Sequence, residues 1–207
     1  MSKITNTGVF IPEGSAAAAD VAGSSQIWTK SDVPSSLYHT DDAGTDFRIN
    51  GTTVSAEQAT TSGTSIDFTG IPVGVKRVTL LCNSVSVSGG NEFLVQLGDS
   101  GGVETSGYLS RYGRISGASP ATEGSTAGFI MFNDDAPLLH EIVVDIYLQD
   151  ATNNTWVGMF IEAVNSTTIM AYGGGSKSLG GTLDRIRLTT AAGSETFDAG
   201  AASIQFS

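Results

Sequence analysis

One stretch, residues 65–86 (SIDFTGIPVGVKRVTLLCNSVS), limits the fold more than any other part of the chain. Polar and apolar side chains alternate on both sides of a turn in which Pro72 lies between two glycines. Proline fixes its own φ and glycine adopts conformations that other residues avoid, so the chain reverses there. The apolar positions of the two flanking segments are Ile66, Phe68, Val78, Leu80 and Cys82. A period of two is typical of a half-buried strand, so the stretch predicts strand, turn and strand.

The same alternation continues to the end of the chain. Residues 139–148 and 155–164 predict a hairpin, because the segment between them has the Asp and Asn content of a turn. Strands recur at the short intervals that are typical of a β-sandwich or jelly roll, and no segment keeps a helical period over three turns. The predicted class is all-β, with a small N-terminal β unit followed by a jelly-roll-like β-sandwich.

Two domains are expected, residues 1–62 and residues 63–207. Within the first, residues 25–50 predict three short strands that are too short to enclose their own large side chains. Exposing these side chains would leave an apolar patch that soluble monomers rarely tolerate. We therefore expect this segment to anchor the protein and to form a homotrimer through Ile27, Trp28, Leu37, Tyr38 and Phe47.

Charge and composition exclude several classes of function. The formal net charge is −11 and no basic stripe is present, which argues against nucleic-acid binding. No apolar run is long enough to cross a bilayer, and the first residues lack the pattern of a secretory signal. The single cysteine, Cys82, falls among apolar neighbours and is expected to be a buried structural thiol. Nothing in the sequence calls for a cofactor.

Residues 98–102 spell GDSGG, the string that surrounds the nucleophile of many serine proteases. That chemistry needs a histidine within hydrogen-bond reach of Ser100 and a carboxylate behind it. His39 falls in the N-terminal unit, and His140 follows the serine in the wrong order for that family. GDSGG between two strands is also an ordinary hairpin turn, which is the interpretation we adopt.

Acidic residues form no recognisable reaction or metal site. The pairs Asp41–Asp42 and Asp134–Asp135 lack the ordered ligand spacing of a calcium loop, so we expect solvated turn residues. A glycosidase carboxylate pair drawn from Glu141, Asp145 and Glu162 is the weaker alternative, since strands of any acidic protein carry such residues. We predict no catalytic residue and no metal ligand.

One cluster breaks the strand alternation and precedes a loop of small residues. It contains Tyr108, Arg111, Tyr112 and Arg114. Aromatic rings stack on sugars, arginine donates to hydroxyl and carboxylate groups, and loops on rigid β scaffolds often bind ligands. The cluster is a candidate ligand or partner contact. The alternative is that the two tyrosines pack over an edge of the sandwich or at a subunit contact.

Four strings resemble a known group of proteins. They are SSQIWTKSDVPSSLYHTDDAGTDFRI, SGTSIDFTGIPVGVKRVTLL, FLVQLGDSGGVETSGYLS and GGTLDRIRLTTAAGSETFDAGAASIQF. The last three are similar to a domain of virion structural proteins of tailed bacteriophages, including tail-fibre-like proteins, and the first is similar to a short β unit that precedes such domains. The resemblance covers nearly all of the chain from about residue 22, and it brings no catalytic signature and no binding residue.

The resemblance implies a non-enzymatic virion protein that assembles in the host cytoplasm. We expect an N-terminally anchored surface appendage, fibre-like or spike-like, that contacts other virion proteins and a host surface glycan. The first alternative is a head-decorating protein, and the alternatives of other classes are a free-standing carbohydrate-binding module and a hydrolase. Copy number on the particle separates the first two, and glycan binding separates a receptor binder from a structural cap.

Overall fold

The computed structural model describes residues 13–19, 23–31, 36–41, 44–49, 51–116, 120–136, 138–165 and 168–207. The chain forms two compact units, Met1–Thr53 and Val54–Ser207 (unit 1 and unit 2). Over the described ranges every regular element is a strand, which confirms the predicted all-β class. The described part of the chain contains no helix long and apolar enough to span a membrane.

Unit 1 is a small sheet of four strands in the order of the chain. The strands are β1 (Glu13–Gly14), β2 (Gln26–Lys30), β3 (Ser36–Thr40) and β4 (Asp46–Arg48). β2 pairs in parallel with β1 and antiparallel with β3. The cross-strand pair Trp28 and Tyr38 stacks with ring centroids 5.1 Å apart, which is a favourable arrangement for two aromatic rings.

Unit 2 contains a smaller sheet in the order β10-β9-β17-β7, with β13 paired to β9. Its strands are β7 (Ser65–Thr69), β9 (Phe93–Asp99), β10 (Gly102–Val103), β13 (Phe129–Met131) and β17 (Arg185–Thr190). β9 and β10 pair through Asp99 and Gly102, so the GDSGG string is the turn of a hairpin, as expected.

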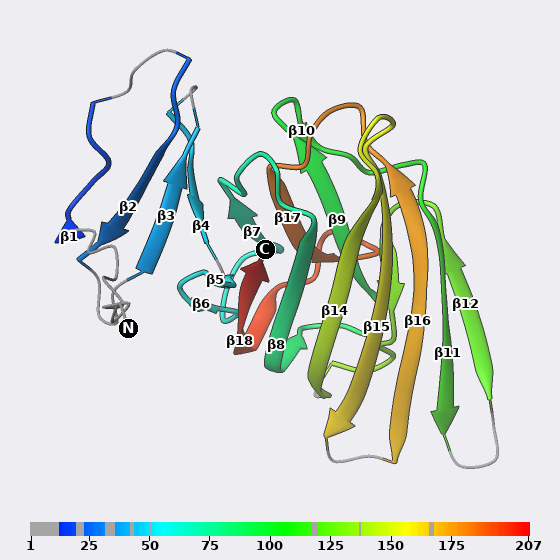
Figure 1. The fold of residues 1–207 in the computed structure, drawn as a ribbon. Coiled ribbons are helices and arrows are strands. Elements are labelled where there is room, and N and C mark those ends of the chain that lie inside the picture. Colours follow the sequence, from blue (N-terminus) through cyan, green and yellow to red (C-terminus); the bar gives the residue numbers. More distant parts are fainter. Residues whose placement is uncertain are drawn as a thin grey trace, which may run out of the picture. The chain divides into compact units, whose positions relative to one another are not determined.

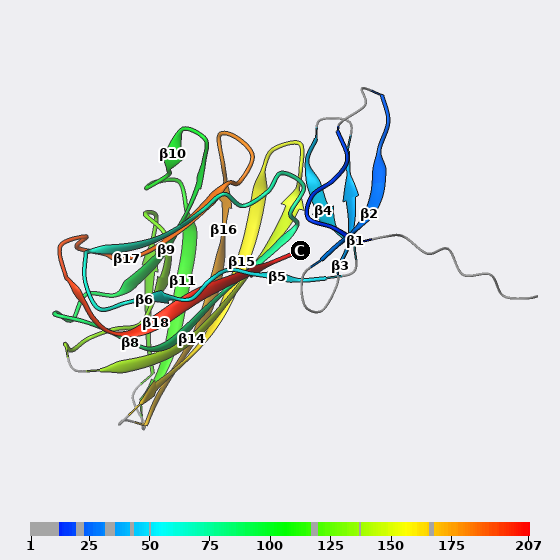
Figure 2. The same cartoon turned by 90° about the vertical axis from the view of Figure 1, so that its left-hand side faces the viewer.

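The larger sheet of unit 2 runs in the order β12-β11-β16-β15-β14-β8-β18-β5, with β6 paired to β18 (Figure 1). Its strands are β5 (Thr53–Val54), β6 (Gln58–Ala59), β8 (Arg77–Val87), β11 (Leu109–Ser116), β12 (Ala121–Ser125), β14 (Leu139–Asp150), β15 (Thr155–Asn165), β16 (Ile169–Ser178) and β18 (Phe197–Phe206). The predicted hairpin of residues 139–148 and 155–164 is confirmed as β14 and β15. Figure 2 shows the curvature of these long strands from the side.

The units divide after Thr53, whereas composition placed the boundary after residue 62. The difference has a structural reason, because the polar segment after residue 54 pairs with β18. The Ser55 amide donates to Ile204 at 2.8 Å, and the Thr60 amide donates to Gly200 at 2.9 Å. Residues 55–60 therefore belong to the edge of the larger sheet, despite their lack of apolar alternation.

The core fills the space between the two sheets of unit 2. Among the described residues, the cluster of buried apolar side chains lies entirely within unit 2. Its largest fully buried members are Phe93, Tyr108, Phe129, Phe132, Trp156 and Phe197. The predicted inward positions Val78, Leu80 and Cys82 are all buried, which confirms the period-two pattern. Two packed sheets agree with a β-sandwich, while the jelly-roll topology stays a prediction.

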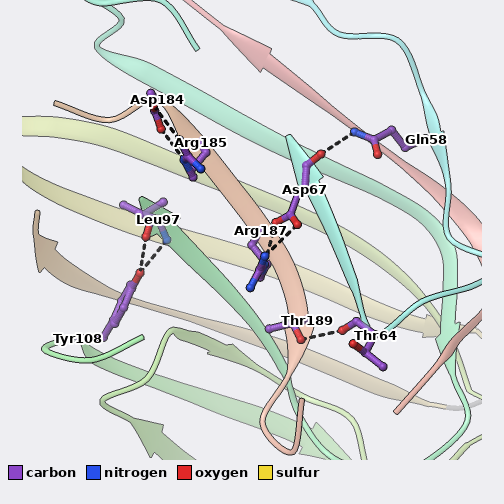
Figure 3. Close-up of polar contacts among 9 residues, drawn as sticks. All are labelled: Gln58, Thr64, Asp67, Leu97, Tyr108, Asp184, Arg185, Arg187 and Thr189. Atoms are coloured by element: carbon purple, nitrogen blue, oxygen red, sulfur yellow. Dashed lines mark hydrogen bonds and ion pairs between the residues drawn. The ribbon is translucent and has the colours of Figure 1, made fainter. Parts of the chain in front are cut away.

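Polar side chains of β7 and β17 lie on the solvent side of the smaller sheet (Figure 3). Arg187 of β17 pairs with Asp67 of β7, with Nε 2.7 Å from Oδ1, and the Gln58 amide donates to the backbone carbonyl of Asp67. Next along β17, Arg185 pairs with Asp184 at 2.7 Å. These exposed charges keep this side of the sandwich in contact with water, as is usual for an antiparallel sheet with one buried face.

Candidate functional site

The structure separates the predicted ligand cluster into two buried tyrosines, a half-buried Arg114 on the same side of β11 as Tyr112, and an outward-pointing Arg111. Tyr108 is fully buried and Tyr112 is 4% exposed, so both belong to the core. The Tyr108 hydroxyl accepts a bond from the Leu97 amide at 2.6 Å (Figure 3). It also donates to the Glu104 carbonyl at 3.0 Å. Burial raises the pKa of both tyrosines. Because both tyrosine side chains are buried, a ligand at the surface does not reach them.

The two arginines of the cluster differ in their partners. Arg114 pairs with Asp134 at 2.7 Å and lies over the ring of Phe132, 4.8 Å from its centroid. Arg111 is exposed on the outer side of β11, and its side chain leans over Gly124 of β12. Within the described part of unit 2, Arg111 is the one arginine without an ion pair.

Arg111 borders a hollow on the outer side of the larger sheet. The hollow has a volume of about 570 Å³. It is lined by Leu109, Ser110, Arg111, Gly124, Ser125, Thr126 and Gly174. The two glycines leave the floor without side chains, and Arg111 and Leu109 stand beside it.

The hollow is one part of a wide apolar surface. The ladder places the outward residues of β14, β15, β16 and β11 in four rows, which we call the outer face. The rows are Tyr147-Val157-Ser176-Leu109, Asp145-Met159-Gly174-Arg111, Val143-Ile161-Tyr172-Gly113 and Glu141-Ala163-Met170-Ile115. Nine of these sixteen positions hold exposed large apolar side chains, which is far more than scattered surface residues would give.

Sequence reasoning missed the outer face as a site, although β15 carried a signal. Its outward residues Val157, Met159 and Ile161 are as apolar as the inward ones. A strand of an antiparallel sheet that has water on one side normally alternates apolar and polar residues. β15 departs from this rule, because it is apolar on both faces.

A buried polar network lies on the inner side of the same strands. His140 and Glu162 are both fully buried, with His140 Nδ1 2.5 Å from Glu162 Oε1. The other ring nitrogen lies 3.2 Å from Asn133 Oδ1, and Glu162 Oε2 accepts the Phe132 amide at 3.1 Å. Every polar atom of the pair therefore has a partner, as burial in an apolar core requires.

This network does not build the reaction sites that the sequence raised. Both ring nitrogens of His140 are taken by Glu162 and Asn133, whereas Ser100 lies in an exposed turn. Glu162 points inward, while Glu141 and Asp145 point to the opposite side of the sheet, so the three carboxylates do not share a cleft. Within the ranges that the structure describes, no group of three or more His, Cys, Asp or Glu residues is placed to hold a metal ion.

The predicted acidic pairs have separate roles. Asp134 is the ion-pair partner of Arg114, and Asp135 accepts a bond from the Ala136 amide at 2.9 Å. Asp41 accepts the Thr45 amide at 2.8 Å, while Asp42 lies outside the described residues.

The network predicts a pH effect on stability. Burial raises the pKa of Glu162 above its ordinary value of 4.5, so the folded state favours the protonated carboxyl. That contribution is complete below about pH 4.5 and is lost as the pH rises through the raised pKa. We expect the unfolding free energy of the wild type, relative to Glu162→Gln, to fall as the pH increases above 4.5. Urea titrations at several pH values measure it, and a difference that stays flat or increases would contradict the expectation.

The predicted anchor residues of unit 1 divide between its two faces. Trp28 is 8% exposed and its Nε1 donates to Thr40 Oγ1 at 2.9 Å, so this ring is already packed in a single chain. Ile27 and Leu37 remain exposed at 59% and 36%. The side chain of Phe47 lies outside the described residues. The exposed pair keeps this segment a candidate contact surface, although Trp28 no longer supports the argument from exposed area.

No protein-family model matches the chain, and comparisons with the curated proteins and with the solved structures find no significant match. The likeness to phage virion proteins therefore stays a prediction.

Proposed function

We propose that the chain is a non-enzymatic structural protein of a tailed-phage virion. In this proposal unit 1 anchors the protein to other virion proteins, and unit 2 is the displayed β-sandwich of a surface appendage. The observation that carries the proposal is the apolar outer face of the larger sheet. A broad apolar surface suits permanent protein contacts, whereas a reaction site needs a concave pocket with converging polar groups. The sequence resemblance supports the virion as the place of assembly.

A head-decorating protein is the alternative within the same class, and microscopy separates the two. An antibody against unit 2 is applied to particles of the phage that encodes the chain, followed by gold labelling and electron microscopy. We expect gold at the tail or its fibres for an appendage, and over the whole head for a decoration. Particles without label, together with hydrolysis of a host polysaccharide by the purified protein, would contradict both assignments.

A carbohydrate-binding module is the second candidate function. Arg111 favours it, because this arginine borders a hollow and has no acidic partner among the described residues. The exposed ring of Tyr172 lies over Gly113, at the same end of β11. An arginine beside an aromatic ring is suited to a sugar that carries a carboxylate.

A further inference from the structure

The outer face is complementary to itself. We propose that a second copy of the chain docks on it, face to face, with a two-fold axis that runs along the strands between β15 and β16. This pairing goes beyond the proposed function, which requires a contact surface but does not say what covers it.

The distribution of exposed apolar side chains points to a second copy as the occupant. Over the described residues, thirteen large apolar side chains are exposed, and nine of them lie on the outer face. Those elsewhere in unit 2 are Val54 and Val73, which stand alone. An apolar surface of this size is covered best by another of the same kind, and on unit 2 the matching surface is the same face of another copy. A contact between identical patches is isologous and closes as a dimer.

The rows of the outer face are complementary to those of a second copy that is rotated by 180° onto the first. A two-fold axis between β15 and β16 brings each row onto the same row of the second copy in reversed order. Met159 of one copy then meets Gly174 of the other, and Val143 meets Gly113. Large side chains thus enter positions without side chains, one of which forms the floor of the 570 Å³ hollow. Packed sheets cross at about 30°, which preserves these pairings best near the axis.

Charge agrees with the same arrangement. The reversed second row places Arg111, which has no ion-pair partner among the described residues, over Asp145 of the second copy. The charged residues of the face and its β8 border are Arg77, Arg111, Glu141 and Asp145, two of each sign. The whole chain carries −11, so two copies repel one another over most of their surface. A locally balanced face is where they approach at the lowest electrostatic cost.

The area is sufficient for a stable pair. Together with the neighbouring strands β8 and β12, the face spans six strands about 4.8 Å apart and roughly seven residues of about 3.3 Å each. This gives a surface of ~29 Å by ~23 Å, or ~670 Å², before the relief of the side chains is added. Specific interfaces bury about 600–1,000 Å² on each partner. The outer face therefore reaches the size of a specific interface.

Charge variants at Met159 test the pairing. The experiment uses Val54–Ser207, which contains the whole described core cluster, so that association through unit 1 does not contribute. Sedimentation equilibrium should give the mass of two copies for the wild type. Met159→Lys and Met159→Glu should each weaken association by ~100-fold or more, because like charges meet near the axis. An equimolar mixture of the two variants should recover the mass of two copies.

Val73→Lys is the matched control, since Val73 is equally exposed but lies in the turn between β7 and β8. It should keep the wild-type mass. Met159 is 61% exposed, so neither variant should disturb the fold of the single copy, and both should melt by circular dichroism at the temperature of wild type diluted until it no longer pairs. A wild type that stays a single copy, a Met159→Lys variant that stays paired, or a mixture that fails to pair would each overturn the proposal. Binding of an acidic oligosaccharide by a monomeric wild type would assign the face to the second candidate function instead.

Discussion

Replacing Glu162 by alanine should cost about 3–5 kcal/mol of unfolding free energy, because each buried polar group that loses its hydrogen-bond partner costs about 1–3 kcal/mol and the missing side chain leaves a cavity. Glu162 accepts bonds from both the His140 ring and the Phe132 amide, and it is fully buried. Its removal leaves two polar groups without partners among aromatic side chains. Domains are stable by about 5–15 kcal/mol in total, so this single change removes a large part of the stability. Urea unfolding followed by circular dichroism measures it.

Glu141→Ala is the control for this prediction. Glu141 lies on the adjacent strand but points outward, where its carboxylate accepts bonds from Ser84 and Asn165. Water can replace those bonds, so we expect a cost of about 1 kcal/mol or less. The double variant His140→Leu/Glu162→Leu should recover much of the loss, because apolar residues of similar volume often replace a buried pair without penalty. Equal costs for Glu162→Ala and Glu141→Ala would show that the pair is not a structural element.

The fold class was predictable because one physical rule applies along most of unit 2. Most inward strand residues are apolar, and β7 of the smaller sheet shows the alternation at Ile66, Asp67 and Phe68. The edge formed by residues 55–60 was not predictable, since its contacts with β18 use backbone groups and hydroxyls that leave no hydrophobic period. Pairing between segments about 140 residues apart is not encoded in a local pattern.

The candidate site was harder to predict than the fold. Tyr108 and Tyr112 are separated by four residues, so strand alternation places them on one side of β11 and Arg111 on the other. The prediction that the segment is irregular grouped all these side chains in one cluster, whereas the sheet places them on opposite sides of β11. To predict the contact of His140 with Glu162, the register of β14 against β15 must be known. In this ladder Ile142, and not His140, lies directly opposite Glu162, and the register shifts between Leu148 and Asp150. A bulge of this kind changes which side chains meet, and its position does not follow from composition.

Gly175→Ala should be as damaging as many large core deletions, although it adds one methyl group. Gly175 lies in the middle of β16 and faces the core. A Cβ there would lie 2.1 Å from the Leu109 carbonyl oxygen and 2.8 Å from the Ser110 Cα. Both atoms belong to the backbone of β11, so the two strands must separate, and no side chain can rotate to relieve the clash. We expect a loss of about 2–3 kcal/mol or more, measured by urea unfolding.

Gly113→Ala is the matched control, because Gly113 also lies mid-strand, one strand away. Its Cβ would meet the tip of the Tyr172 ring and the Thr122 methyl group at 3.8 Å or more, which is ordinary contact. Alanine in a strand loses less conformational entropy than glycine, so this variant should be stabilised by up to about 0.5–1 kcal/mol. Measuring both in the Met159→Lys background removes any contribution from self-association. The two substitutions are chemically identical. Opposite effects on the unfolding free energy would therefore show that the close approach of β11 and β16 is what requires glycine in β16. Equal effects would show that β11 and β16 are not held as closely as the structure has them.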